Sequence, residues 1–197
     1  MKRGGNLINS HTKELIDILK NFEASSSDVV AKIVNSISET FESGGKILIC
    51  GNGGSAADSQ HFAAEFVSSF SKDIQRKSLP ALALTTDSSI ITAYSNDYGF
   101  EGIFARQVEA FGKPGDILIV LSTSGNSLNC IKAIEMAKGL GLKTISFTGN
   151  SGKLRNNVDI NLGVPSSNTQ IIQEVHLVAY HLIVEIIEEK LFRKPKI

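Results

Sequence analysis

The chain has 197 residues, of which 42% are hydrophobic and 20% charged, and this composition predicts one globular domain rather than a disordered or a membrane protein. Its 20 basic residues equal its 20 acidic residues, and without a basic stripe the chain offers nucleic acid no electrostatic partner. Its two cysteines give neither a ligand spacing nor a disulfide framework, and without an apolar leader or a run as long as a membrane span we expect a cytoplasmic protein.

Two helices are predicted ahead of the first strand. Residues 10–22 carry apolar side chains at helical spacing, and residues 28–41 repeat the pattern after the Ser/Asp cap cluster of residues 25–28. These helices could pack on the sheet or on another subunit. His11 lies in the first helix and is expected to be a surface histidine.

The first strand and the segment after it form the best candidate for a binding site. Residues 47–50 have the length and β-branched content of a buried strand. The glycines of residues 51–54 remove side chains that would keep a ligand off the backbone, and Ser55 is expected to cap a helix that runs to about residue 70. A strand, a glycine turn and a helix start together can hold an anion with free N–H groups and a positive helix end.

Asp58, His61 and Glu65 share one face of that helix, because they lie at positions i, i+3 and i+7. A carboxylate and an imidazole one turn apart, near an anion site, suggest acid–base or metal chemistry. A solvated pair of His61 and Glu65 is the plainer alternative, but the flanking Phe62 and Phe66 indicate a mostly buried helix. The turn also fits part of the dinucleotide fingerprint, yet no acidic residue follows about 20 positions later at the end of the next strand, which disfavours nicotinamide binding.

Residues 80–84 are predicted as the second strand, residues 88–94 as a short helix and residues 104–111 as another. The loop between the two helices contains Asn96 and Asp97. Asn and Asp in loops usually make turns, so these two residues would not attract notice on their own.

The clearest buried strand in the chain, residues 117–121, runs directly into residues 122–127, and a helix over residues 128–138 follows. This repeats the first strand–turn–helix design. The hydroxyls of the turn can donate to phosphate oxygens without adding charge, and the helix start supplies a favourable field. An ordinary capped turn needs one serine, so a set of four hydroxyls favours anion binding; the set is Ser122, Thr123, Ser124 and Ser127.

Two more strands, residues 143–147 and 159–164, precede a long helix from about residue 169 to residue 191. Strands that alternate with helices predict a three-layer α-β-α sandwich around a five-stranded parallel sheet, in which ligands bind at the carboxyl ends of the strands. The last helix is apolar on nearly every side and must be enclosed. Its polar exceptions therefore need a reason; they are Gln173, Glu174, His176 and His181.

Five stretches of the chain together carry a family resemblance: residues 51–58, 60–65, 96–99, 122–127 and 173–176 with His181. As a set they resemble the sedoheptulose 7-phosphate isomerases, also called phosphoheptose isomerases, of the sugar isomerase (SIS) domain family, whereas the serine-rich turn alone marks only the wider family. The resemblance covers nearly the whole chain. It implies one SIS domain over residues 1–197, with N-terminal helices at about 10–43 and an α/β core at about 46–191.

The resemblance implies an aldose–ketose isomerase that converts sedoheptulose 7-phosphate to D-glycero-D-manno-heptose 7-phosphate, the first step toward the nucleotide heptoses of lipopolysaccharide or capsule. It also implies a homotetramer with active sites between subunits and, in some members, one zinc ion per subunit. Because the last helix should be buried against other copies, His181 could meet Glu65 of a neighbouring chain.

Carried over by position, the resemblance assigns the catalytic base to Glu65 and the acid to His181. The implied zinc ligands are His61, Glu65, Gln173 and His181. The implied substrate contacts are Asn52, Gly53, Gly54, Ser55, His61, Glu65, Asn96, Asp97, Ser122, Thr123, Ser124, Ser127 and Gln173. If Glu65 is both ligand and base it cannot do both freely, so zinc binding and proton transfer are alternatives for it.

Two features set the chain apart from the family pattern. Where the family commonly has arginine at the entry to the last helix this chain has Ile171, so a positive charge toward the substrate is either missing or supplied by Arg106 or Arg155. On an ideal helix Glu174 nearly eclipses His181, whereas the glutamine before it is rotated away by about 80°. The choice of that glutamine as a ligand therefore depends on the resemblance alone.

A non-catalytic regulator is the alternative from another functional class. The DnaA initiator-associating protein resembles these isomerases in fold and tetramer but works by protein binding. The acid–base pair separates the two, and because Glu65 and His181 are both present, the sequence favours the isomerase.

Overall fold

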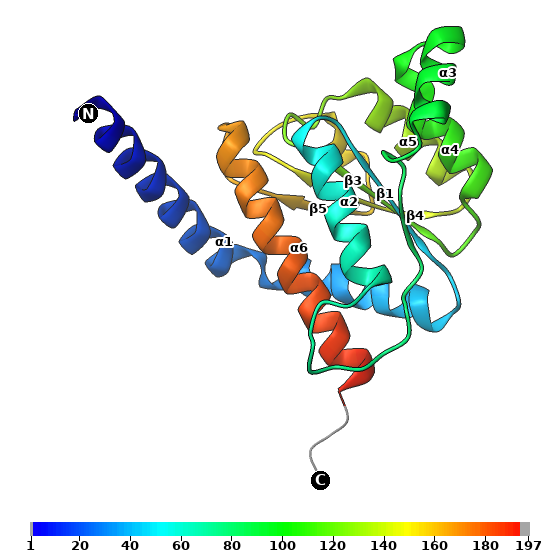
Figure 1. The fold of residues 1–197 in the computed structure, drawn as a ribbon, viewed down its shortest axis with the longest axis horizontal. Helices are drawn as coiled ribbons and strands as arrows, with labels where there is room; N and C mark the ends of the chain where they lie inside the picture. The colour runs from blue at the N-terminus through cyan, green and yellow to red at the C-terminus, as the bar shows by residue number, and fades with distance from the viewer. Residues whose placement is uncertain (1, 194–197) are drawn as a thin grey trace.

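Five short strands pair into one sheet in the structure, a computed structural model that describes residues 2–193 (Figure 1). Residue 1 and residues 194–197, the ends of the predicted domain, lie outside that range. The strands are β1 (Ile47–Gly51), β2 (Ala81–Ala83), β3 (Ile117–Ser122), β4 (Lys143–Thr148) and β5 (Ile160–Gly163). Every pairing is parallel and the order is β2-β1-β3-β4-β5, which confirms the predicted sheet.

Helices cover both faces of this sheet. They are α1 (Lys2–Glu42), α2 (Gly54–Val67), α3 (Ser88–Tyr98), α4 (Ile103–Phe111), α5 (Leu128–Gly139) and α6 (Thr169–Phe192), with short 3₁₀ helices η1 (Phe100–Gly102) and η2 (Lys153–Asn156). Alternate side chains of β1 enter two separate cores: Ile47 and Ile49 pack with α1, α2 and α6, whereas Leu48 and Cys50 pack with α4 and α5. The three-layer α-β-α sandwich is therefore confirmed.

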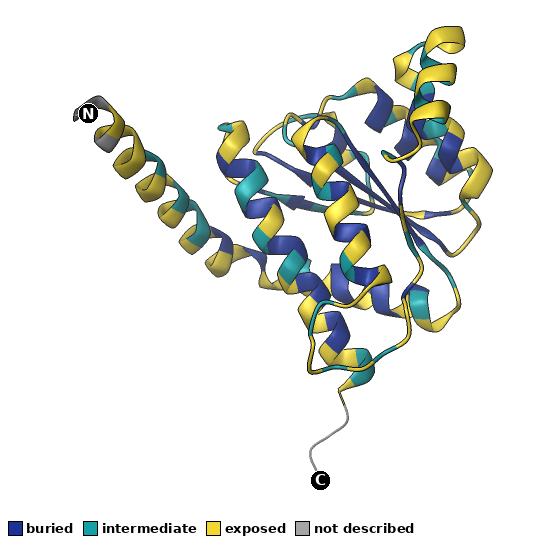
Figure 2. Ribbon diagram, viewed as in Figure 1, coloured by how far each residue is buried: buried dark blue, intermediate teal, exposed yellow. Residues whose placement is uncertain are grey.

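The two predicted N-terminal helices are one continuous helix, α1, so the prediction of a break at residues 25–28 was wrong. The Ser25 hydroxyl donates to the Asn21 carbonyl one turn earlier, at 2.7 Å, and such a contact tends to bend a helix without ending it. Figure 1 shows α1 changing direction part-way along its length, with its first half standing clear of the sheet. Most residues of that half are exposed (Figure 2).

The start of α2 also differs from the prediction. The helix begins at Gly54, and its N-cap is Gly53 rather than Ser55. Gly53 has a φ of +57°, in the region that glycine enters without a steric penalty. The turn thus depends on glycine to redirect the chain from strand to helix.

Helix α3 is longer than predicted and ends at Tyr98, so Asn96 and Asp97 lie in its last turn rather than in a loop. Its start is fixed by Asp87, whose side chain accepts a hydrogen bond from the Ile90 N–H group at 2.9 Å.

Helix α6 is long and apolar enough to cross a membrane by length and composition, contrary to the expectation that no run reaches that length. Half of its apolar window is buried inside the protein, as in the core helix of a soluble protein. It packs beside α1 and α2 (Figure 1). One chain does not enclose it fully, because Leu177, Leu182 and Ile186 remain exposed.

A buried arginine ties the end of α2 to α6. Arg76, in the loop after α2, lies 2.5 Å from the Glu188 carboxylate on α6, and both side chains are fully buried. Its guanidinium also donates to the carbonyls of Glu65 and Phe66, at 2.7 and 2.8 Å. These carbonyls belong to the last turn of α2, where the helix itself offers no N–H partner.

The Glu188 carboxylate accepts hydrogen bonds from several donors. Besides Arg76, the backbone N–H groups of Phe70 and Ser71 donate to its carboxylate, each at 2.9 Å. Burial raises the pKa of Glu188, but the hydrogen bonds from these N–H groups and from Arg76 outweigh burial, so the pKa lies below its usual value. The carboxylate is therefore ionised at neutral pH.

Replacing Glu188 by alanine should destabilise the protein strongly, because it leaves the Arg76 charge buried without a partner. Breaking a buried pair in this way typically costs about 3–5 kcal/mol. Urea unfolding followed by circular dichroism would measure the loss. Glu109→Ala is the matched control: Glu109 pairs with Arg106 on the surface, where water screens the attraction, and the midpoint should stay nearly constant. Equal midpoints for the two variants would contradict this account.

Candidate active site

The turns after β1 and β3 lie side by side, because these strands are neighbours and Gly51 pairs with Leu121. The chain proceeds from β1 outward to β2 on one side and from β3 outward to β4 on the other, so the strand order reverses between them. Open parallel sheets bind ligands in the crevice outside such a reversal point. The fold therefore brings the two predicted anion-binding turns together at the carboxyl end of the sheet, where such a crevice is expected.

Two glycines of the glycine turn (residues 51–54), Gly51 and Gly54, are closely packed. A Cβ on Gly51 would lie 2.7 Å from the Ser55 carbonyl oxygen, and a Cβ on Gly54 would lie 2.6 Å from the side-chain nitrogen of Gln173. The second contact places the predicted substrate residue Gln173, on α6, directly against the turn. Ser55 is buried, and its carbonyl accepts the Ser59 hydroxyl at 2.7 Å.

The serine turn, residues 122–127, presents hydroxyls that are only partly committed. The Ser122 and Ser127 hydroxyl oxygens lie 3.2 Å apart, and the Ser124 oxygen accepts the Asn126 N–H group at 3.2 Å. Ser124 is exposed and its own O–H proton has no acceptor among these contacts. A hydroxyl offers one donor and two acceptor positions, so the turn can still donate to a ligand oxygen.

A pair of amides joins the glycine turn to the start of α5, and the sequence predicted only one of them. Asn52 of the glycine turn and Asn129 of α5 exchange two hydrogen bonds, at 2.9 and 2.8 Å. The Asn129 side-chain oxygen also accepts the Cys130 N–H group at 2.9 Å, which fixes which way the amide faces. Asn129 is buried, and a polar residue on the inward face of α5 was the available signal.

The predicted catalytic residues lie close together where α2 and α6 run side by side. His61 Nε2 lies 2.8 Å from a Glu65 carboxylate oxygen and 3.3 Å from His181 Nε2. The three ligand-type atoms all lie within 4.8 Å of one another. The three side chains of one chain thus already lie close together, and a pairing of Glu65 with His181 of a neighbouring chain stays a prediction.

Burial and neighbouring charge tune the groups around this cluster. Burial lowers the pKa of His181, and the adjacent His61 lowers it further, while Glu65 opposes both. His181 is thus neutral at pH 7 and can donate one ring N–H. Asp58 is half-buried, and burial raises its pKa against the opposing effect of His61.

Tyr180 is a further member that sequence reasoning missed. Its hydroxyl lies 2.9 Å from His61 Nδ1, on the side of the ring away from Glu65. Burial and the charges of Asp58 and Glu65 raise the pKa of Tyr180, so the hydroxyl stays protonated. On an apolar helix a tyrosine looks like one more core residue, which is why the pattern gave no signal.

The cluster offers a metal ion two imidazoles and one carboxylate. Zinc binds imidazole nitrogen and carboxylate oxygen at about 2.0–2.2 Å in tetrahedral sites, which places ligand atoms roughly 3.3 Å apart. The separations of 2.8 and 3.3 Å around His61 Nε2 are close to that value. Gln173, the fourth predicted ligand, lies eight residues before His181, about 12 Å along α6, and so is not brought to the cluster within one chain.

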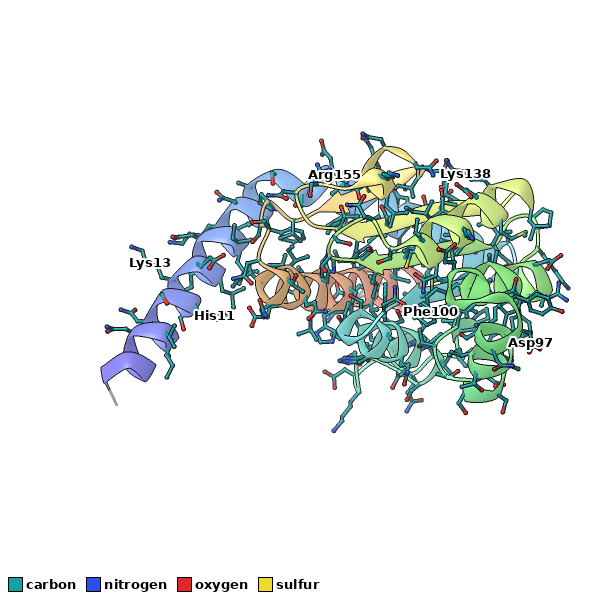
Figure 3. All side chains as sticks on the ribbon, turned by 90° about the horizontal axis from the view of Figure 1, so that it is seen from above. His11, Lys13, Asp97, Phe100, Lys138 and Arg155 are labelled. Carbon is teal, nitrogen blue, oxygen red and sulfur yellow. The ribbon has the colours of Figure 1, made fainter. Side chains whose placement is uncertain are left out.

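The other polar residues of α6 have separate partners. Glu174 lies 2.9 Å from His11, so His11 is not the unpartnered surface histidine that was expected. In Figure 3, His11 is on the side of α1 that faces α6. His176 is buried beside Phe147 and is not part of the cluster. Burial lowers its pKa to about 4, so its ring is neutral at pH 7.

Asn96 and Asp97 are exposed on α3, where the Asn96 amide donates to the Asp97 carboxylate at 2.8 Å. Figure 3 shows Asp97 at the end of the molecule remote from the first turns of α1. The contacts of the described residues link neither side chain to the glycine turn or the serine turn. Their assignment to the substrate stays a prediction.

The two arginines suggested as substitutes for the one that the family pattern expects at Ile171 both have partners in this chain. Ile171 is fully buried in the core. Arg106 pairs with Glu109 on the surface, and Arg155 donates to the Gly149 carbonyl at 2.7 Å.

Residues 10–149 match the SIS domain family. The chain belongs to the SIS domain family. The phosphoheptose isomerase of Roseiflexus sp. (strain RS-1) is 52% identical over 180 residues, which cover 91% of this chain and 90% of the relative. Solved phosphoheptose isomerase structures from Francisella tularensis and Neisseria gonorrhoeae superpose with TM-scores of 0.91 and 0.88 at 40% and 38% identity, each covering 94% of this chain and 98% of the other.

Membership of the SIS domain family confirms the resemblance drawn from the motifs, and the relatives place the chain among the phosphoheptose isomerases of that family. Nothing in these comparisons favours the non-catalytic regulator. The match reaches only residue 149, so the SIS segment contains both turns and α2, whereas α6 with His181 lies beyond it.

Replacing Ser124 by alanine in this SIS domain should weaken phosphate binding about tenfold, since a hydrogen bond to a charged group contributes on the order of 1.5 kcal/mol. Titration calorimetry with inorganic phosphate would measure the change. Ser43→Ala is the matched control, because Ser43 is an exposed serine just before β1, at the opposite edge of the sheet. Equal phosphate affinity in both variants would leave the serine turn with a structural role only.

Proposed function

We propose that the chain is an aldose–ketose isomerase that converts sedoheptulose 7-phosphate to D-glycero-D-manno-heptose 7-phosphate, at the start of nucleotide-heptose synthesis. Phosphoheptose isomerases about half identical to it over nine-tenths of its length support this activity. The observation that carries the proposal is the cluster of Glu65, His61 and His181, because an isomerase needs a carboxylate and a second proton donor in one place.

The reaction moves one proton between neighbouring carbons while the carbonyl changes place. Glu65 removes a proton from C1 of the ketose, and His181 gives its ring proton to the carbonyl oxygen on C2, which forms an enediol. The O1 hydroxyl then returns its proton to His181, and Glu65 delivers the carbon-bound proton to C2. Protons and electrons balance, and both groups end in their starting states.

His61, Glu65 and His181 are the residues that would hold a zinc ion. When bound, zinc supplies Lewis-acid polarisation of the substrate carbonyl. Glu65 cannot ligate and accept a carbon-bound proton with the same oxygen at once, so its two oxygens or two states of the site divide these roles. Gln173 contacts substrate at the glycine turn in this arrangement rather than completing the ligand set of its own chain.

The length of α2 separates the phosphate crevice from the proton-transfer cluster. Gly54 and Glu65 are eleven residues apart, or roughly 16 Å along the helix. The six carbon–carbon bonds of a heptose, each about 1.5 Å long, span less than about 9 Å. The phosphate group, its hydrogen bonds and the reach of the Glu65 side chain add to this length, so a site within one chain would require a fully extended substrate. Following the homotetramer that the resemblance implies, the proposed site combines the phosphate turns of one subunit with the cluster of another.

The surface supports assembly into the homotetramer that the sequence predicted. Leu182 and Ile186 of α6 and Leu19, Phe22 and Val30 of α1 line an apolar groove of about 580 Å³. Leu7 and Ile8, in the half of α1 that stands clear of the sheet, are 64% and 71% exposed. A long helix with exposed apolar residues gains stability from a partner, and a second copy of the chain is the partner proposed. With a phosphorylated sugar as substrate, we place the enzyme in the cytoplasm.

Purified protein should convert sedoheptulose 7-phosphate to the aldose, and Glu65→Gln should lower the rate by roughly 10²–10⁴-fold, because a general base contributes about that much. Proton NMR of the aldose C1 proton would follow the reaction. Glu109→Gln, an exposed carboxylate on α4, is the control and should keep full activity. A wild-type protein that forms no aldose would overturn the proposal.

Mixing two inactive variants tests whether the site is shared between subunits. Glu65→Gln removes the base, and Ser124→Glu repels the phosphate. If these groups come from different chains, hybrid tetramers should regain roughly a quarter of the wild-type sites at random mixing. An inactive mixture, with subunit exchange verified by mass spectrometry and a tetramer by light scattering, would place both groups in one chain.

A further inference from the structure

Tyr180 is fully buried, and it contacts three residues that belong to the proposed catalytic cluster or to its helix. Its ring stacks on Phe62 of α2, with centroids 5.0 Å apart and planes 19° from parallel. The rings of His61 and His181 meet it edge-on, at 5.4 and 4.9 Å. Its hydroxyl lies 2.9 Å from His61 Nδ1. The side chain thus forms the inner wall against which both imidazoles rest.

The partners of His61 decide where its ring proton lies when no metal is bound. Nε2 faces the Glu65 carboxylate at 2.8 Å, and an ionised carboxylate only accepts hydrogen bonds. The Nε2–Glu65 contact therefore favours the tautomer of the neutral ring that has its proton on Nε2 and a lone pair on Nδ1. The Tyr180 hydroxyl then donates to Nδ1.

A metal ion at Nε2 would reverse this arrangement. The Nε2 lone pair would bind the ion, the ring proton would move to Nδ1, and Nδ1 would become a donor. A tyrosine hydroxyl can both donate and accept. The hydrogen bond between Tyr180 and His61 can therefore exchange its donor and acceptor without any movement of the backbone or of the ring.

We propose that Tyr180 is a positioning residue whose hydroxyl holds His61 in one orientation, donating to Nδ1 in the metal-free site and accepting from Nδ1 in the metal-loaded site. This inference rests on the metal role given to the cluster under the proposed function. The Tyr180–His61 hydrogen bond is then present in both states of the site. Without metal, His61 binds the Glu65 carboxylate; with metal, His61 and Glu65 are both ligands of the ion. A phenylalanine would keep the stacking on Phe62 and could serve neither state.

The test is Tyr180→Phe, measured by two readouts that do not depend on catalysis. Nitrogen-15 NMR of ring-labelled histidine reports which nitrogen of His61 carries the proton. In the wild type it should be Nε2 without zinc and Nδ1 with zinc. Competition with a chromophoric chelator gives zinc affinity, which should fall roughly 10- to 100-fold in the variant, the usual cost of losing such an outer hydrogen bond. Tyr94→Phe is the matched control, since Tyr94 lies on α3, and both readouts should equal the wild type.

Several outcomes would overturn the inference. Zinc affinity in Tyr180→Phe within threefold of the wild type would show that the hydroxyl does not support the ligand. Should the variant not fold, the wild type decides alone: a metal-free His61 with its proton on Nδ1, or averaging equally between both nitrogens, contradicts the assigned bond. The proposed function fails separately, because a protein that forms no aldose can still show the predicted His61 tautomer.

Discussion

The alignment of α2 beside α6 is the constraint on which the candidate site depends. The two helices run in the same direction, and contacts at three levels hold them: Gln173 against Gly54, His181 against His61, and Glu188 against Arg76. Sliding one helix by a single residue would move it about 1.5 Å, whereas a catalytic constellation tolerates roughly 0.5 Å. A buried ion pair is weak evidence of net stability. Here its contribution is to fix the register of two helices that carry separate parts of one site.

Most of the fold could be predicted from the sequence because β1 and β3 are short apolar runs, each followed by a glycine or hydroxyl turn and a helix, and further strands alternate with helices around them. The error in α1 shows the limit of that reasoning. The serines before Asp28 have the chemistry of a cap, but Phe22 and Ile33 on either side are both buried in one core, and packing of this kind overrides a local preference. The end of α3 differs from the prediction for another reason: Asn96 and Asp97 favour turns in general, but the helix continues through them to Tyr98.

Some residues of the candidate site could also be predicted from the sequence, and others could not. His61 and Glu65 were predictable because they lie one turn apart on a helix, so the sequence itself sets their distance. Asn129 and Tyr180 were not, because their partners Asn52 and His61 are 77 and 119 residues away. Only the order of the strands decides that α5 starts beside the glycine turn and that α6 lies along α2. Contacts of that range follow from topology rather than from pattern.

The two turns at the crevice contain no charged residue: residues 51–54 are Gly-Asn-Gly-Gly, and residues 122–127 are Ser-Thr-Ser-Gly-Asn-Ser. They attract an anion through amide and hydroxyl dipoles, whose field falls away faster with distance than that of a net charge. A phosphate approaching this crevice would receive little long-range steering, and its capture would depend little on ionic strength. Recognition is then a matter of fit at contact, and a departing phosphate breaks no ion pair within these turns. Such a crevice can exchange substrate and product of equal charge without favouring either by electrostatics.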